Sequence, residues 1–259
     1  MHHLVHQFVL CYHAIRHSWP AALAVSPYMF RRQVETLLRR GYSGVTFREL
    51  TNGEAPPRAF AVTFDDAYRS VMRNARPVLD DLGMPATVFA PTSMVGKPGP
   101  MAWDGIDQWL GTPYEHELTC MSWAELRELR GAGWEIASHT KSHPRLTELE
   151  DDELGSELIE SREVCERELG LTSVTLAYPY GIHDVRVRSA ARDAGYAAAA
   201  ADRPGPVRQF QWPRINLHPV DDPWRFRLKV SPAVRALRDS PPGVALDRLR
   251  CRYRKSGAA

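Results

Sequence analysis

The chain has 259 residues, 44% of them hydrophobic, so it is long enough to bury one sizeable core. Its 33 Lys and Arg residues nearly balance its 31 Asp and Glu residues, which leaves no overall charge that would favour nucleic acid or a membrane surface as a partner. Four scattered cysteines without a CxxC pair fit neither a zinc ribbon nor a small disulfide-rich scaffold.

The N-terminal region carries no export or membrane signal that the sequence reveals. Its apolar run FVLCY is shorter than the hydrophobic region of a signal peptide, and no 18-residue apolar stretch follows anywhere. The sequence therefore predicts a cytoplasmic protein without a membrane span. We expect residues 1–259 to form a single domain, with a basic tail at about 247–259. We favour a solvated chain end for this tail, and the alternative is that it contacts an acidic surface.

Short apolar runs recur along the chain with helical patterns between them. This alternation predicts parallel strands joined by crossover helices. We expect seven strands, at residues 8–12, 60–64, 86–90, 134–137, 174–178, 196–200 and 213–217. The pattern indicates an α/β fold in which helices surround one sheet.

Capping signals mark several of the intervening helices. Ser26 followed by Pro27 predicts a helix that starts there and ends at Gly41. Ser122 and Glu125 form a predicted capping box at the start of another helix. Further helices are expected near residues 70–82, 147–170 and 184–194.

The one long irregular segment spans residues 91–121. Loops of that length inside a compact domain are usually functional or disordered. Its aromatic residues Trp103, Trp109 and Tyr114 have two interpretations, stacking on a sugar ring or packing beneath the loop, and both stay open.

Two polar clusters follow predicted strands. Asp65 and Asp66 stand side by side after the second strand, where each negative charge raises the pKa of the other unless a positive group lies between them. His139 and His143 follow the fourth strand, and a helical turn would bring both imidazoles to one side. Two histidines and a carboxylate leave an open position for water, which is typical of a catalytic zinc site. Because the carboxyl ends of parallel strands meet at one edge of a sheet, we expect the clusters to converge.

The elements TFDD, SHxxxHP and YPYG, each beside a predicted strand and in this order, resemble the polysaccharide deacetylase family. This family is also called the NodB-homology or carbohydrate esterase family 4 deacetylases. The resemblance spans roughly residues 8–217. It implies a distorted (β/α)7 barrel that binds one divalent metal ion, usually zinc, and removes acetyl groups from N-acetylated sugars.

The same resemblance assigns roles to both clusters. It implies that Asp65 is the general base, and that Asp66, His139 and His143 are the metal ligands. The ion would then take the charge of Asp66 and leave Asp65 free to accept a proton from water. This division of tasks explains why two carboxylates stand side by side.

The segment LAYPYG stands where the family has its third motif, so the backbone N–H of Tyr180 is a candidate oxyanion donor. The arginine usual in this motif is missing, because Ala177 or Tyr178 occupies its position. We nominate Arg214, on the last predicted strand, to orient Asp65 instead. The alternative is that Arg214 is an ordinary surface cation.

Two histidines are candidates for the general acid. The segment INLHP places His218 late in the chain, but too close behind the preceding motif to match the family pattern well. The segment LCYHAI presents His13 at the end of the first strand, which resembles the Tyr-His motif of the branch that includes biofilm poly-N-acetylglucosamine deacetylases. We favour His13 over His218 as the group that protonates the leaving amine. The alternative for His13 is that it merely caps a strand.

The sequence therefore predicts a metal-dependent N-deacetylase that acts on an amino sugar in a glycan, a glycolipid or a precursor and releases acetate. The expected partner is an N-acetylated carbohydrate, and the sequence does not specify an oligomeric state. Two alternatives stay open. One is a sugar-binding barrel without catalysis, because the third-motif arginine is missing and DDA replaces the commoner DDG. The other is a metal-dependent hydrolase of a non-sugar amide.

Overall fold

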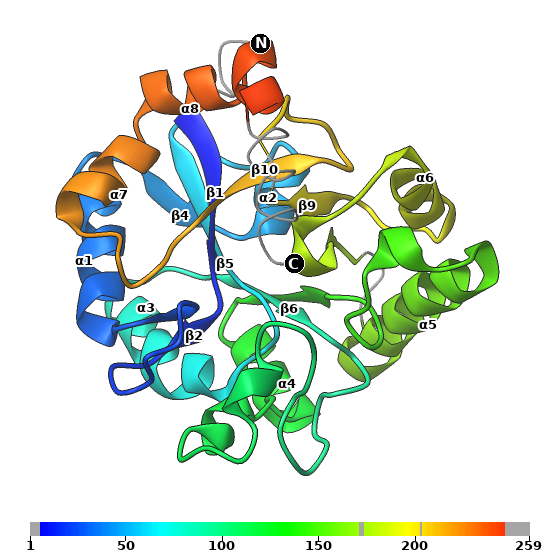
Figure 1. Cartoon of the computed structure of the whole chain (residues 1–259). Helices are drawn as coiled ribbons and strands as arrows, with labels where there is room; N and C mark the ends of the chain where they lie inside the picture. The colour runs from blue at the N-terminus through cyan, green and yellow to red at the C-terminus, as the bar shows by residue number, and fades with distance from the viewer. Residues whose placement is uncertain (1–5, 171–173, 203, 247–259) are drawn as a thin grey trace.

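Seven parallel strands close into a barrel around which the helices are arranged (Figure 1). The structure is a computed structural model that describes residues 6–170, 174–202 and 204–246. The basic tail predicted at 247–259 lies outside the described residues. Around the barrel the strands are β1 (Gln7–Tyr12), β5 (Ala59–Phe64), β6 (Thr87–Ala90), β7 (Glu135–Ser138), β8 (Leu176–Ala177), β9 (Ala199–Ala201) and β10 (Trp212–Asn216).

The ring closes because β1 pairs with both β5 and β10. Leu10 stands opposite Val62 on one side and opposite Ile215 on the other, and every pairing in the ring is parallel. Each of the seven predicted strands overlaps one strand of this ring. The expected distorted (β/α)7 barrel is thereby confirmed.

Three short strands have no counterpart in the sequence prediction: β2 (Ala14–Ile15), β3 (Ala24–Val25) and β4 (Ser43–Val45). The first two pair only with each other, whereas β4 pairs with the first half of β5. The second half of β5 pairs with β6. Strands β4 and β6 therefore lie one after the other along the same edge of β5, which distorts the barrel. Runs of two or three residues are too short to show the alternation that identifies a strand.

Four longer helices lie where the sequence predicts them: α1 (Pro27–Leu38), α4 (Trp123–Gly131), α5 (Asp151–Leu169) and α6 (Val185–Asp193). The hydroxyl of Ser26 accepts a hydrogen bond from the backbone N–H of Met29 at 3.2 Å, as an N-cap does. Ser122 and Glu125 form the expected capping box of α4. Gly170 ends α5 in the left-handed conformation with a φ of 61°, which glycine adopts without steric cost.

The helix predicted at 70–82 is present in two parts. Residues Val71–Ala75 form a π-helix, η2, and α3 follows at Arg76–Asp81. Pro77 has no backbone N–H and its ring displaces the carbonyl four residues earlier, so it interrupts the α-helical ladder. The N–H of Arg76 bonds to the carbonyl of Val71, five residues back, and the turn before the proline widens accordingly.

The remaining helices are short. Three have no counterpart in the prediction: α2 (Phe47–Thr51), α7 (Pro223–Lys229) and α8 (Pro232–Arg238). Single 3-10 turns are η3 (Asp107–Trp109), η4 (Glu115–Leu118), η5 (Leu146–Glu148) and η6 (Pro179–Gly181). The irregular segment 91–121 contains η3 and η4. Within the described ranges no helix combines the length and the apolar character needed to cross a bilayer.

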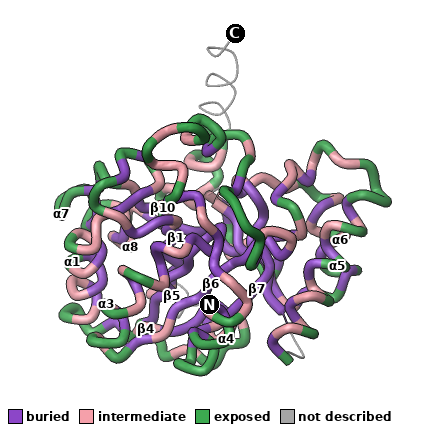
Figure 2. Tube along the Cα trace, turned by 90° about the horizontal axis from the view of Figure 1, so that it is seen from below, coloured by how far each residue is buried: buried purple, intermediate pink, exposed green. Residues whose placement is uncertain are grey.

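The barrel interior changes from apolar to polar along its strands. Side chains alternate between the two faces of a strand, and the inward positions nearer the amino ends hold a buried cluster that includes Val9, Ala61, Ala137, Ala200 and Trp212. Two residues further along the chain stand Cys11, Thr63 and Arg214, which are still within their strands, and His139 and Asp202, which directly follow theirs. The barrel strands are mostly buried, as Figure 2 shows, and of the polar layer only Asp202 is half-buried, so this layer lies on an apolar one.

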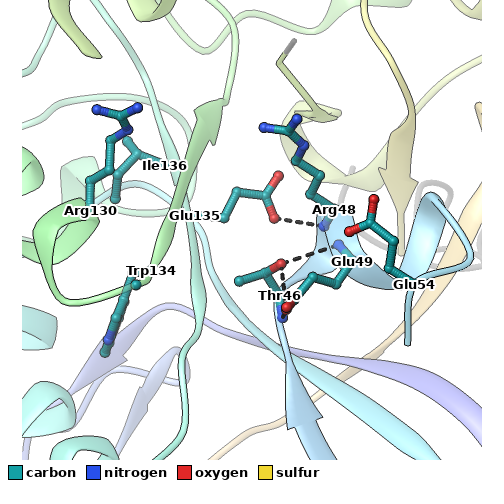
Figure 3. A pocket seen from close by; sticks show the side chains of 9 residues that line it. Thr46, Arg48, Glu49, Glu54, Arg130, Trp134, Glu135 and Ile136 are labelled. Atoms are coloured by element: carbon teal, nitrogen blue, oxygen red, sulfur yellow. Dashed lines mark hydrogen bonds between the residues drawn. The ribbon is translucent and has the colours of Figure 1, made fainter. Parts of the chain in front are cut away.

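A second polar feature lies at the opposite end of β7. A pocket of about 320 Å³ there is lined by the side chain of Glu135 (Figure 3). Its carboxylate accepts hydrogen bonds from the Arg48 backbone N–H at 2.8 Å and from the hydroxyls of Thr87 and Thr175 at 2.9 and 2.5 Å. Burial raises the pKa of Glu135 despite these donors. The carboxylate links α2 to β6 and to the residue that directly precedes β8, so we assign Glu135 a structural role.

Candidate active site

A pocket of about 150 Å³ lies at the carboxyl ends of the barrel strands. Six residues selected from the sequence line it: His13, Asp65, Asp66, His139, His143 and Tyr180. The two polar clusters, at 65–66 and 139–143 in the chain, therefore meet at one edge of the sheet, as the strand order predicts.

One carboxylate and two imidazoles face one another in this pocket. The Oδ1 of Asp66 lies 3.6 Å from the Nε2 of His139 and 3.4 Å from the Nε2 of His143. The ligand atoms of the three residues all lie within 4.8 Å of one another. The Oδ1 of Asp66 is buried and has no hydrogen-bond partner in the described part of the chain. Such an orphaned acceptor beside two imidazole nitrogens fits a divalent cation, which would take a bond from each of the three.

Burial decides the protonation of the two imidazoles. It lowers the pKa of His139, against the opposing effect of the Asp65 charge. It lowers the pKa of His143 well below the usual value, and His139 lowers it further. Both rings are therefore neutral near pH 7, and a neutral imidazole is the form that binds a metal.

The carboxyl group of Asp66 is in the opposite situation. Burial raises its pKa well above the ordinary value, and the negative charge of neighbouring Asp65 raises it further. The ionised carboxylate is therefore unfavourable in this site unless a positive group compensates it. A bound cation would supply that compensation, so the donor set and its electrostatics both fit a metal.

Asp65 is held by a different partner. Its two oxygens accept hydrogen bonds from Nη1 and Nη2 of Arg214 at 2.6 and 2.7 Å. Burial alone would raise the pKa of Asp65, but the guanidinium, together with His139, outweighs it and holds this pKa well below the usual range. Asp65 therefore stays ionised, and its Oδ2 faces the Nε2 of His139 at 3.9 Å. The structure thus brings Arg214 onto Asp65, the contact for which the sequence nominated it.

Asp202 is a site residue that the sequence prediction missed. The Nε of Arg214 donates to the Oδ1 of Asp202 at 2.8 Å, so one buried guanidinium joins two carboxylates. Asp202 directly follows β9, and it stands after the predicted strand at 196–200 as Asp65 stands after its own strand. That position was a usable signal, since residues that follow β1, β5 and β7 line the same pocket.

The two candidate general acids occupy different places. His13 follows β1 and lines the pocket. Burial lowers its pKa, against the opposing charge of Asp65. His218 does not line the pocket, and its Nδ1 lies 3.1 Å from the carbonyl oxygen of Ala22. The geometry therefore favours His13 of the two.

A second group of metal-ligating atoms adjoins the first. Ligand atoms of Cys11, His13 and Asp65 also lie within 4.8 Å of one another. Both oxygens of Asp65 are already bonded to Arg214, whose positive charge opposes a cation at that place. Burial also raises the pKa of the Cys11 thiol well above its ordinary value, which disfavours the thiolate that would bind a metal. We therefore assign the candidate metal site to the group around Asp66.

The backbone is strained at this pocket. Five residues other than glycine have a positive φ in the described chain, and all five lie in or beside the site: Asp66, Ala67, Thr140, His143 and Tyr180. Such conformations cost roughly 1–3 kcal/mol each and cluster at functional sites. No pattern in the sequence predicts them, because each depends on the packing around it.

The long segment 91–121 covers one side of the pocket. The ring of Trp103 stacks on the imidazole of His143, with the centroids 4.2 Å apart and the planes 20° from parallel. Trp109 instead packs edge-on against Tyr114 and Trp19. The sequence left two interpretations of these aromatic residues open. Trp109 packs beneath the loop, which is the second of them, whereas Trp103 contacts a residue of the site.

A closed parallel barrel with a polar layer, a candidate metal site and an oriented carboxylate at its carboxyl edge has the architecture and the residue types of a barrel hydrolase. The chain matches the family model described as polysaccharide deacetylase over residues 52–199, which is more than half of its length. It therefore belongs to the polysaccharide deacetylase family and is, by class, an amide-hydrolysing N-deacetylase.

Individual relatives agree with this family. YxkH of Bacillus subtilis (strain 168), which is assigned by name to the polysaccharide deacetylases, is 28% identical over 208 residues, or 78% of this chain and 67% of YxkH. The poly-β-1,6-N-acetyl-D-glucosamine N-deacetylase of Staphylococcus aureus (strain MSSA476) is 26% identical over 172 residues. That match covers 61% of this chain and 54% of the staphylococcal protein, so the chain spans about half of that relative.

Solved structures show the same architecture. The crystal structure of BC0361, a polysaccharide deacetylase from Bacillus cereus, superposes with a TM-score of 0.72 at 25% identity. The superposition covers 87% of this chain and 69% of the Bacillus cereus chain. The barrel is therefore common to this chain and to a solved member of its family.

Proposed function

We propose that this chain hydrolyses the N-acetyl group of an amino sugar in a glycan, a glycolipid or a precursor, and that it does so with one divalent metal ion, zinc being the first candidate. The observation that carries the proposal is the meeting of Asp66, His139 and His143 around an unpartnered carboxylate oxygen. Asp65, fixed by Arg214, stands directly beside this cluster. The products are acetate and a free amine.

Asp66, His139 and His143 would hold the ion and leave a coordination position open. When bound there, such an ion polarises the acetyl carbonyl and lowers the pKa of water. The three protein ligands are contributed by the loops after β5 and β7, which the closed barrel holds in register.

The other residues move or stabilise charge. Asp65, kept ionised and oriented by the two hydrogen bonds from Arg214, accepts a proton from the attacking water. In its protonated form, which the charge of Asp65 favours and burial opposes, His13 donates a proton to the nitrogen of the leaving amine as the C–N bond breaks. The backbone N–H of Tyr180 donates to the oxyanion of the tetrahedral intermediate.

The size of the pocket supports recognition of the acetamido group. Its volume of about 150 Å³ is smaller than the roughly 300–1,000 Å³ of sites that enclose a drug-sized ligand. We infer that the acetamido group enters, while the sugar ring stays at the rim. The named substrate of the staphylococcal relative, poly-β-1,6-N-acetyl-D-glucosamine, supports a β-linked N-acetylglucosamine polymer as the first substrate to test.

The test uses protein without a polyhistidine tag. Metal content is measured by mass spectrometry, and acetate release is measured on β-1,6-linked and β-1,4-linked N-acetylglucosamine oligomers. We expect one zinc per chain and acetate release that is lost on chelation and restored by zinc. Asp65→Asn should keep the metal but lose turnover, whereas His139→Ala should lose the metal.

Four results would contradict parts of the proposal. Normal turnover by Asp65→Asn would remove the assigned base. Acetate release that survives complete chelation would remove the metal. Hydrolysis of simple acetanilides without any action on acetylated sugars would favour the non-sugar amidase, and a metal-loaded chain that only binds oligomers would favour the non-catalytic barrel.

A further inference from the structure

The two histidines of the candidate metal site are fixed in different ways. The Nδ1 of His139 donates a hydrogen bond to the carbonyl of Ala177 at 2.8 Å, which turns its Nε2 towards Asp66. The Nδ1 of His143 is buried, and no other residue that the structure describes accepts a hydrogen bond from it; its polar contact is with the backbone of His143 itself. Metal-binding histidines almost always use their second nitrogen for such a bond, because it fixes the orientation of the ring.

Aromatic contacts surround the ring of His143 instead. The indole of Trp103 stacks on it at 4.2 Å and 20°. The phenol ring of Tyr180 meets it edge-on at 4.7 Å, and the imidazole of His139 meets it at 4.9 Å. A tilt of the His143 ring out of its present plane would break the stacking on Trp103, because the two ring planes would no longer lie parallel.

We propose that Trp103 is a positioning residue that holds the imidazole of His143 in its metal-binding orientation by stacking, in the place of a hydrogen-bond acceptor. This inference rests on the proposed metal site. Its consequence is that the segment 91–121, although it contributes no metal ligand, controls how tightly the metal is held.

The segment is anchored well enough for that role. The side chain of Arg145 forms an ion pair with Asp104, the residue that follows Trp103, and its guanidinium lies over the Tyr180 ring at 4.3 Å. On the other side of Trp103 in the chain, the backbone N–H of buried Met101 bonds to the carbonyl of Leu118 at 2.9 Å. Trp103 is thus held between a backbone contact and a charged contact.

The expected effect follows from the usual cost of losing such a supporting group. Removing the partner that orients a metal-binding histidine typically weakens metal binding by about 10- to 100-fold. Stacking is weaker than a charge-assisted hydrogen bond, so we expect a loss near the lower end, about tenfold. Phenylalanine at position 103 would keep a flat ring against His143 and should preserve most of the affinity.

The experiment measures the zinc affinity of the metal-free protein by competition with a chromophoric chelator. The variants are Trp103→Ala, Trp103→Leu and Trp103→Phe, with Trp109→Leu as the control in the same segment, since Trp109 does not contact the site. We expect Trp103→Ala and Trp103→Leu to bind zinc about tenfold more weakly, Trp103→Phe to bind nearly as the wild type does, and Trp109→Leu to be unchanged. Circular dichroism confirms that each variant is folded.

A second readout is independent of affinity. Cu²⁺ bound beside Trp103 should quench part of the tryptophan fluorescence, and Trp103→Phe should abolish that part while Trp109→Leu keeps it. Unchanged zinc affinity in folded Trp103→Leu would overturn the inference, and so would an equal loss in Trp109→Leu. If the wild-type chain binds no zinc at all, the proposed metal site fails first, which is a distinguishable result.

Discussion

The buried ion pair between Arg214 and Asp65 provides the most informative perturbation of the site. Arg214 is only 1% exposed, its Nη1 and Nη2 lie 2.6 and 2.7 Å from the two oxygens of Asp65, and its Nε lies 2.8 Å from Asp202. Arg214→Met keeps much of the side-chain volume but leaves the buried carboxylate of Asp65 and the half-buried carboxylate of Asp202 without a counter-charge. Breaking a buried pair by removing one partner costs about 3–5 kcal/mol.

This loss should be visible in thermal unfolding. A chain of this size loses about 2–4 °C in Tm per kcal/mol, so Arg214→Met should unfold about 6–20 °C below the wild type. Arg214→Lys restores a charge without the two-pronged geometry, so it should recover stability more fully than kcat. Differential scanning calorimetry and acetate release measure the two effects on the same preparations.

The control is Arg227→Met, which removes an exposed arginine of α7 and should change stability by no more than about 0.5 kcal/mol. If Arg214→Met unfolds at the same temperature as this control and keeps the wild-type kcat, the pair neither stabilises the fold nor orients Asp65. That result would refute the role given to Arg214.

Three further predictions use other residues of the barrel. His13→Ala should lower kcat by about 10²- to 10⁴-fold in the acetate assay while His218→Ala stays close to the wild type, and equal losses would exclude His13 as the acid. Asp202→Asn leaves Arg214 bonded to Asp65, so calorimetry should show a smaller loss of thermal stability than for Arg214→Met. A larger loss would show that the bond to Asp202 contributes more to stability than the pair with Asp65. Burial raises the pKa of Glu135 in the folded chain above its usual 4.5. As the pH rises, the unfolded chain therefore loses this proton at a lower pH than the folded chain does. The wild type should accordingly lose stability relative to Glu135→Gln as the pH rises through 4.5. Urea unfolding from about pH 4 to 8 measures the difference, which should become constant above the raised pKa; a difference that is flat throughout would show an unperturbed carboxyl.

The barrel could be predicted because its signals are local. Each of the seven ring strands is a short apolar run next to turn residues, and each overlaps its predicted range. The π-helix at Val71–Ala75 depends on a single proline, Pro77, whose effect on the preceding turn is readable only once the helix is known to continue through it. Strands β2 to β4 are too short to carry any pattern.

The site was predictable where its residues follow strands, and not where they come together through a loop. The Asp65, Asp66, His139 and His143 cluster follows from parallel strands sharing one edge, and the same reasoning applied to Asp202 would have found it. The pair formed by Asp104 and Arg145 joins segments 41 residues apart across an irregular loop, and no spacing rule relates them. The stacking of Trp103 on His143 is equally dependent on the fold.

The most direct test of the account is the coordination of the ion itself. X-ray absorption spectroscopy on the zinc-loaded wild-type enzyme should show two imidazole ligands, with all nitrogen and oxygen neighbours at about 2.0–2.2 Å and no sulfur. A sulfur neighbour at about 2.3 Å, or fewer than two imidazoles, would place the ion away from Asp66, His139 and His143 and contradict the proposed metal site.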